Sequence, residues 1–310
     1  MSGVYRDSEI GAFLRGQRAR LRPEDVNLPP GGPIRRVPGL RRDEVAQLAG
    51  VSSDYYARLE QGRNITPSAE VLAAIAGALR LDDAGRTYLF DLVRPRGGAE
   101  RRRAYSAQRV RGSVQRMMDA WSDQPAVLTG RRTDVLATNA LGRALFADFD
   151  AMPVRTRNYT RWLFLDEGAR ALFPDWERIS ADMAAVLRLD AGRYPDDPRT
   201  TELVGELTMR SEHFLRAWTN HRVMEHTHGV KRFLHPVVGE LQLEYEGLAV
   251  PGDADQTVFV YSAPPGSEAE DALRLLASWT AGTGGGPVDG STAASPADYT
   301  TGSPAPGRAS

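Results

Sequence analysis

Apolar residues recur at helical spacing through most of the first 95 positions of the chain. Those from Ile10 to Leu21 predict an amphipathic helix over residues 8–22, with arginines between them and an end before Pro23. A loop rich in proline and glycine follows. Later apolar stripes predict four more helices, so that five are expected in all. The fourth helix of the chain opens with Thr66 as N-cap and Pro67 as first residue, and the fifth spans about residues 83–93.

The second and third helices fit a helix-turn-helix. The run RDEVAQLAGVSSDYYARLEQGR places Gly50 at the turn, where a positive φ is easiest for glycine. Ser52 is the predicted N-cap of the second motif helix, and Gly62 is its predicted stop. A hairpin that serves packing alone is the alternative, and arginines on the exposed faces argue against it. Apolar residues expected to face the bundle are Val45, Ala49, Val51, Tyr56 and Leu59.

After residue 125 the pattern changes to short β-like runs and longer helices. Two runs at 126–129 and 134–138 flank a polar turn, and Asn139 is the predicted N-cap of the next helix. An aromatic-rich helical region extends over about 159–222. Strands are then expected within 231–236, 239–250 and 256–264 as an antiparallel meander, and a last helix over 268–279. A hairpin, helices and a meander together indicate a five-stranded sheet with a helical face.

Two segments lie between these parts of the chain, and a third follows them. Residues 97–103, GGAERRR, read as a polar hinge. The apolar stripe from Val110 to Trp121 predicts a helix that either joins the domains or forms a dimer seam. Residues 282–310 include 24 Gly, Pro, Ser, Ala and Thr out of 29, which predicts a disordered tail.

Charge is distributed unevenly along the 310 residues. Residues 1–111 carry 20 basic and 13 acidic side chains, whereas the remainder carries 19 and 27, so a near-neutral total hides a basic front and an acidic rear. Such asymmetry favours an anionic partner for the front part, with nucleic acid before a membrane surface.

Composition narrows the class of protein further. The absence of cysteine removes disulfide frameworks, thiolate metal sites and thiol nucleophiles. Charges near the start argue against a signal peptide, and no long apolar run suggests a membrane span, so we expect a soluble cytoplasmic protein. Neither a G-x-S-x-G elbow, a Walker loop nor a G-x-G-x-x-G following a strand occurs, so no catalytic residue, no cofactor and no enzyme activity is expected.

Four histidines lie within fifteen residues and invite a metal interpretation. Against it, the run HRVMEH is one residue too long for H-x-x-E-H, and H-E-x-x-H is absent. On a strand, His226 and His228 would face one side together. Contact with an acidic ligand and a purely structural role remain the other interpretations, and no metal residue is assigned.

The motifs resemble two known families. Residues 8–93 resemble the lambda-repressor-like DNA-binding domain of the XRE family. The phrases VPGLRRDEVAQLAGVSSDYYARLEQGR, LDEGARALFPDWE, AGRYPDDPR, HTHGVKRFLHPVVGELQLEYE and LLASWTA resemble the MmyB-like actinobacterial regulators across residues 35–281. This resemblance implies an all-α five-helix DNA-binding domain over residues 1–96, followed by an α+β PAS-like domain with an antiparallel sheet over 97–281, which binds a fatty acid or similar small acid.

The resemblance also implies which residues meet DNA. In such domains the second motif helix enters the major groove, so its outward side chains contact bases, whereas flanking arginines contact phosphates. Asp54 either accepts from a cytosine amino group or stabilises the helix N-terminus. The carried-over groove contacts are Ser52, Ser53, Asp54, Tyr55 and Arg58, and the phosphate contacts are Arg41, Arg42 and Arg63.

These expectations combine into a ligand-responsive transcription regulator. A homodimer is expected on a double-stranded operator, because one reading helix covers only about four base pairs. An acidic effector needs cations or N–H donors within an apolar cavity. The alternatives are a rear domain that binds a protein partner without ligand, and a metal-dependent enzyme. The candidate ligand residues are Arg222, His226, His228 and Lys231, with Arg132 and Asn139 near the hairpin.

Overall fold

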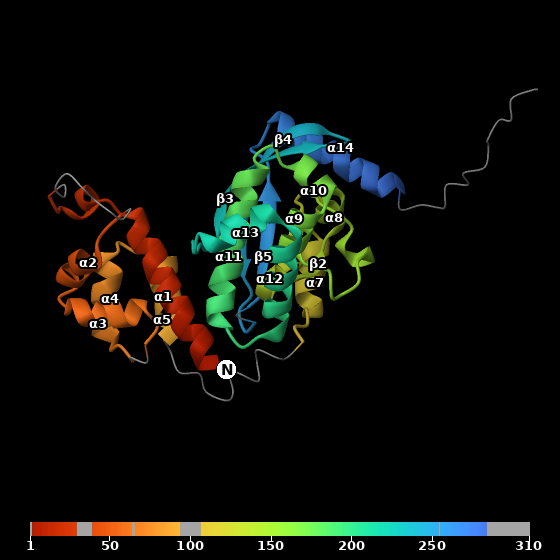
Figure 1. The fold of residues 1–310 in the computed structure, drawn as a ribbon. Helices are drawn as coiled ribbons and strands as arrows, with labels where there is room; N and C mark the ends of the chain where they lie inside the picture. Colours follow the sequence, from red (N-terminus) through yellow and green to blue (C-terminus); the bar gives the residue numbers. More distant parts are fainter. Residues whose placement is uncertain (1, 30–38, 64–65, 94–106, 254, 284–310) are drawn as a thin grey trace, which may run out of the picture.

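The computed structural model describes residues 2–29, 39–63, 66–93, 107–253 and 255–283 (Figure 1). Its N-terminal part is helical, as the sequence predicts. The helices are α1 (Ser2–Arg20), the short 3₁₀ helix η1 (Pro23–Val26), α2 (Arg42–Leu48), α3 (Ser53–Glu60), α4 (Ala69–Ala78) and α5 (Asp83–Val93). The hinge at 97–103 and almost the whole predicted tail lie outside the described residues.

The helix-turn-helix has the local geometry that its sequence predicts. Gly50, at the turn, has φ of 66°, and the Ser52 hydroxyl accepts the backbone N–H of Tyr55 at 3.2 Å as N-cap of α3. Gly62, just past the end of α3, also has φ of 66°. Two boundaries were predicted wrongly. Helix α1 begins at Ser2, and α4 is capped by Ser68 rather than Thr66, because the Ser68 hydroxyl accepts the N–H of Val71.

A buried carboxylate ties three helices of this bundle together. The Glu60 side chain, at the end of α3, is fully buried. It accepts hydrogen bonds from Arg18 of α1 at 2.9 and 3.0 Å and from Arg42 of α2 at 2.9 Å. Burial alone would raise the pKa of Glu60, but these hydrogen bonds from Arg18 and Arg42 hold the pKa below its usual value.

The C-terminal part contains the predicted hairpin, helices and meander. Its helices are α7 (Gly112–Asp119), α8 (Ala140–Leu145), α9 (Tyr159–Leu165), α10 (Glu167–Leu172), α11 (Trp176–Arg193), α12 (Pro198–Arg210), α13 (Glu212–Thr219) and α14 (Glu268–Thr283), with 3₁₀ turns η2 (Arg131–Thr133) and η3 (Phe149–Ala151). The strands are β1 (Ala126–Thr129), β2 (Val135–Thr138), β3 (His228–His235), β4 (Gly239–Ala249) and β5 (Thr257–Ser262). They form one antiparallel sheet in the order β2-β1-β5-β4-β3.

The two faces of the sheet are covered by different helices. One face carries Phe233, Leu243 and Tyr261 into the large core formed with α8 to α13. The opposite face, at β1, β2 and β5, packs against Val114 and Met118 of α7. Helix α7 therefore packs on the sheet of its own chain, and alternating burial along β3 and β4 follows the period of two predicted for half-buried strands.

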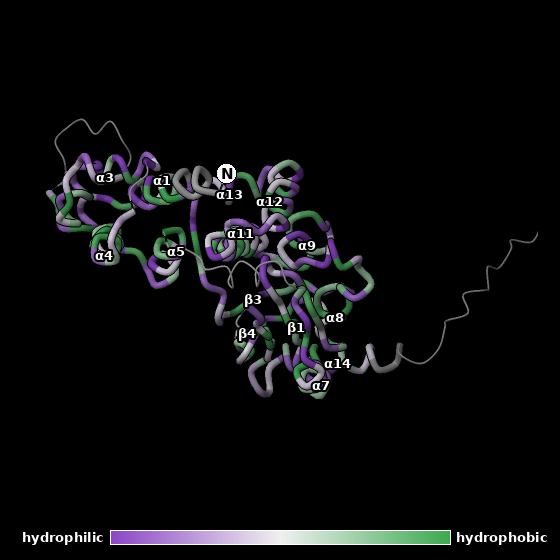
Figure 2. The backbone as a smooth tube through the Cα atoms, turned by 90° about the horizontal axis from the view of Figure 1, so that it is seen from below, coloured by the Kyte–Doolittle hydropathy of each residue, from purple (hydrophilic) through white to green (hydrophobic). Residues whose placement is uncertain are grey.

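Helix α11 lies between the N-terminal bundle and the rest of the C-terminal part (Figure 2). It contacts α5 on one side and α9 and α13 on others. Gly192 permits the close crossing with α5, because a Cβ at this position would overlap the ring of Tyr88. The sequence did not predict this packing between the two parts.

We expect Glu60→Gln to lower the free energy of unfolding of the full chain by about 3 kcal/mol near neutral pH, since two arginines lose their common anionic partner. Because the folded-state pKa is depressed, the wild-type advantage exists above the unfolded pKa and disappears as pH falls through the folded value. Urea unfolding across this pH range, with the exposed Glu24→Gln as control, measures both effects. A difference that is constant with pH would contradict the ionic role.

Candidate ligand cavity and DNA-reading helix

Helix α3 presents its polar side chains outward and its apolar side chains to the bundle. Tyr56 and Leu59 are buried, so the opposite face of α3 is free to meet a partner. Nearly all the residues expected to contact the DNA groove or its phosphates are exposed, and Tyr55 is half-buried. The exposed ones are Arg41, Arg42, Ser52, Ser53, Asp54, Arg58 and Arg63.

Two of these residues also have a local structural role. Asp54 lies in the first turn of α3, where a carboxylate interacts favourably with the helix dipole. Arg42 is 45% exposed and hydrogen-bonded to Glu60, so its guanidinium is partly committed to the bundle. Arg41 and Arg58 have no such bond to Glu60 and are the cleaner probes of DNA contact.

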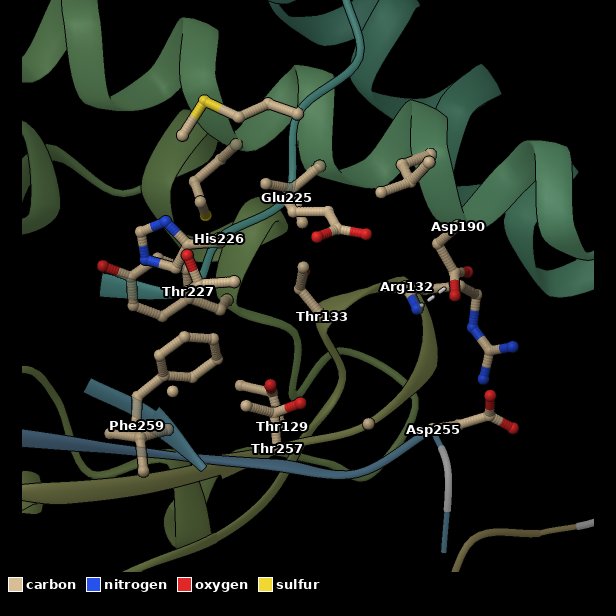
Figure 3. Close-up of a pocket in the computed structure, with 18 of the residues that line it drawn as sticks. Thr129, Arg132, Thr133, Asp190, Glu225, His226, Thr227, Asp255, Thr257 and Phe259 are labelled. Carbon is tan, nitrogen blue, oxygen red and sulfur yellow. Dashed lines mark hydrogen bonds between the residues drawn. The ribbon is translucent and has the colours of Figure 1, made fainter. Parts of the chain in front are cut away.

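A cavity of about 360 Å³ lies between the sheet and α11 (Figure 3). Its volume falls in the range of small-molecule sites. Strands β1, β4 and β5 form one wall, α11 forms another, and residues 224–227 close a third side. Apolar lining comes from Val127, Met183, Val186, Leu189 and Phe259.

The inner end of the cavity holds Lys231, the single lysine of the sequence, which is 3% exposed. Its Nζ donates to the Tyr261 hydroxyl at 3.3 Å and lies 3.3 Å from His226 Nε2. The same Nζ is 4.7 to 5.6 Å from the ring centroids of Tyr159, Tyr245 and Tyr261. In the described part of the chain no carboxylate forms a salt bridge with this amine.

Burial sets the protonation of this end. Burial lowers the pKa of Lys231 to about 7, and the nearby negative charge of Asp182 partly offsets this lowering. Burial and then repulsion from Lys231 hold the pKa of His226 well below its usual value, so His226 is neutral. A lysine that donates to Nε2 fixes the proton on Nδ1, which then donates to the Tyr245 hydroxyl at 3.1 Å.

Tyr159 adds an unsatisfied donor at the same end. Its side chain is buried at the start of α9 and lines the cavity, and its hydroxyl has no hydrogen-bond partner in the structure. A buried hydroxyl without a partner costs about 1–3 kcal/mol, so a ligand acceptor at this point would be favoured.

The other end of the cavity is acidic, and its backbone is conformationally strained. Arg132 and Thr133 have φ of 60° and 63°, a left-handed conformation that non-glycine residues rarely adopt. The Arg132 N–H donates to Asp190 at 3.0 Å, as the dashed line in Figure 3 marks. Burial, together with the charge of nearby Asp255, raises the pKa of Asp190 to about 6. The Arg132 guanidinium is itself paired with two carboxylates, those of Asp134 and Asp197.

The cavity therefore gathers Arg132, His226 and Lys231 among the predicted ligand residues, while the other three lie elsewhere. Asn139 is buried under β1, where its amide bonds five backbone groups and caps α8. Arg222 is exposed and pairs with Asp182 at 2.6 Å. His228 is exposed at the start of β3.

The expectation that His226 and His228 share one face is wrong. β3 begins at His228, so His226 belongs to the preceding connector and lines the cavity, where its ring stacks on Tyr245 at 4.5 Å. His235 instead lies within the core near the Ala144 carbonyl oxygen, at 2.9 Å. In the described ranges, His, Asp and Glu form no group of three or more suited to a metal.

The tyrosines around Lys231 were not among the ligand residues predicted from the sequence. Tyr261 lines the cavity from β5, and Tyr245 is an inward residue of β4, where the alternation of apolar and polar residues indicates its position. Tyr159 carries no such signal, because its place beside Lys231 depends on how α9 packs on the sheet.

No helix in the described part is long and apolar enough to span a membrane.

Comparison with known proteins agrees with both halves of this architecture. Residues 9–89 match a helix-turn-helix domain. Residues 110–276, more than half of the chain, match the MmyB-like transcription regulator ligand binding domain. No curated protein matches the chain. With the helical reading domain ahead of the cavity-bearing sheet domain, the chain belongs to the family of MmyB-like transcription regulators.

Proposed function

We propose that this regulator binds operator DNA through α3 and changes its affinity when a small acid occupies the cavity. Residues 1–96 would form the DNA-binding domain and residues 97–281 the effector domain of a cytoplasmic homodimer. A ligand alters DNA binding only if it prefers one arrangement of the protein over another. Both partners thus act on one conformational equilibrium.

The observation that carries the acid assignment is the buried amine without a carboxylate. A protonated Lys231 in this place has aromatic rings and neutral acceptors around it, and none of the carboxylates that the structure describes lies within salt-bridge distance of its Nζ. An isolated buried charge is costly, and an anionic ligand group would compensate it. The unsatisfied Tyr159 hydroxyl supplies a second donor to the same group.

The rest of the lining supports a hydrocarbon chain on this acid. Met183 and Val186 of α11 face the cavity opposite Val127 and Phe259 of the sheet. Burial of each CH₂ against such side chains contributes about 0.8 kcal/mol. A fatty acid with its carboxylate at Lys231 fits both features.

We expect the full-length protein to carry a co-purifying acid, detected by native mass spectrometry and identified after organic extraction. Such a molecule would be retained because its head and chain are both buried. An extract without acid, from protein that also fails to bind added dodecanoate, would contradict the effector proposal. That result would favour a rear domain that binds a protein partner without a ligand.

We expect Lys231→Met to weaken dodecanoate binding at least tenfold by titration calorimetry, because the ammonium is replaced by an apolar group. In the wild type the affinity is highest below pH 7 and falls by up to about tenfold per unit as pH rises through the Lys231 pKa. The variant should lose this pH dependence. Arg155→Ala, which removes an exposed arginine outside the cavity, is the matched control.

Tyr159→Phe separates ligand contact from a packing role. Removal of an unsatisfied hydroxyl leaves the stability of the ligand-free protein unchanged or higher, whereas dodecanoate affinity falls about fivefold for one lost hydrogen bond. Loss of stability with unchanged affinity would remove Tyr159 from the site.

For DNA we expect Arg58→Ala to reduce discrimination between operator and mismatched sequences by about 1–3 kcal/mol, since Arg58 lies on the outward face of α3. Arg41→Ala should weaken binding to all sequences alike and reduce the salt slope by about one. Fluorescence anisotropy with DNA selected from a random pool measures both. An unaltered operator preference in Arg58→Ala would show that α3 is placed wrongly on DNA.

A further inference from the structure

The connector between α13 and β3 belongs to both halves of the protein. Its first residues contact α1: Arg20 donates to the carbonyl oxygen of Asn220, and His221 packs against Gly16. Val223 is buried within the core of the N-terminal bundle. The next four residues, Met224 to Thr227, line the cavity. Within eight residues, the chain passes from the DNA-binding bundle to the ligand site.

Helix α11 repeats this double role in its last two turns. Leu189 lines the cavity and is also part of the hydrophobic core of the N-terminal bundle. One turn later, Arg193 lines the cavity and pairs with Asp91 of α5 at 3.8 Å. If an occupant of the cavity displaced this helix, the contacts between α11 and α5 would therefore change.

A buried ion pair holds the two halves at this contact. The Glu9 carboxylate of α1 accepts hydrogen bonds from Arg188 of α11 and from the Tyr88 hydroxyl of α5, the latter at 2.9 Å. Arg188 is 1% exposed, and its guanidinium also donates to the carbonyl oxygen of Trp218 and lies 4.0 Å from the centre of that ring. Separation of such a pair is strongly unfavourable, so α1, α5 and α11 move together.

We propose that residues 183–193 and 220–227 transmit the state of the cavity to α1 and α5 through the Glu9–Arg188 pair. The proposal rests on the proposed function in one respect, that the effector occupies this cavity. An occupant that moves Leu189 and the connector changes the energy of the bundle contact, and linkage requires the bundle to influence the cavity equally. The structure thus gives a physical path from effector to reading domain.

The test fills the cavity without a ligand. Val186→Phe, a cavity-lining position on α11, is compared with the full-length wild type by hydrogen exchange and mass spectrometry. We expect α1 and α5 amides to exchange about fivefold faster, while β1 and β2 remain unchanged. Met117→Phe, an exposed position on α7, is the control and should alter neither. If circular dichroism shows that Val186→Phe is unfolded, Thr257→Leu on β5 takes its place.

The ion pair is tested in the same experiment. In the Glu9→Gln background, Val186→Phe should change α1 exchange by less than about twofold, because the amide no longer binds Arg188 as an ion. Unchanged α1 and α5 exchange in a folded Val186→Phe protein would overturn the proposal. So would an undiminished response in the Glu9→Gln background.

Added dodecanoate separates this proposal from that of the effector. Binding of dodecanoate without any change in α1 exchange would overturn the transmission path and leave the ligand assignment standing. An absence of dodecanoate binding, with a full response to Val186→Phe, would support the path and overturn the acid effector.

Discussion

The Glu9–Arg188 ion pair is the contact on which the arrangement of the two halves depends. Where α1, α5 and α11 meet, the fully buried Arg188 is paired with the mostly buried Glu9, and loss of either partner would leave the other charge uncompensated in a poorly solvated place. Gly192 allows α11 to approach α5 closely enough for this to occur. The position of the reading domain is thereby set by a helix that also forms the wall of the ligand cavity.

The cavity also contains buried charged side chains, but the two cations at its opposite ends are paired differently. Lys231 forms no salt bridge with any carboxylate of the described residues, and burial lowers its pKa to about 7. Arg132, at the other end, is fully paired by Asp134 and Asp197 and has a structural role. This difference between Arg132 and Lys231 is the basis of the proposal that an anionic group binds at Lys231.

The sequence predicted the local structure well because local structure depends on neighbours along the chain. Short β-like runs between turn residues predicted the strands, and the hydroxyl of Ser52 and the glycine at 50 fixed the turn and start of α3. The same signals misplaced the start of α4, where Ser68 and Thr66 are both competent caps and the Ser68 hydroxyl is the one that accepts the N–H of Val71. His226 was misplaced by one element because the start of β3 is set by pairing with β4.

The sequence by itself thus determined the helix-turn-helix and the succession of strands and helices along the chain, and it offered His226 and Lys231, which both line the cavity, as candidate ligand residues. Tertiary structure alone decided that the Asn139 amide is hydrogen-bonded to backbone groups, that the Tyr159 ring lies beside Lys231, and that α11 contributes to two hydrophobic cores. Caps and periodicities act over a few residues, whereas these contacts join positions from 13 to 179 residues apart. Their energies depend on burial and pairing, which arise only when the chain is packed.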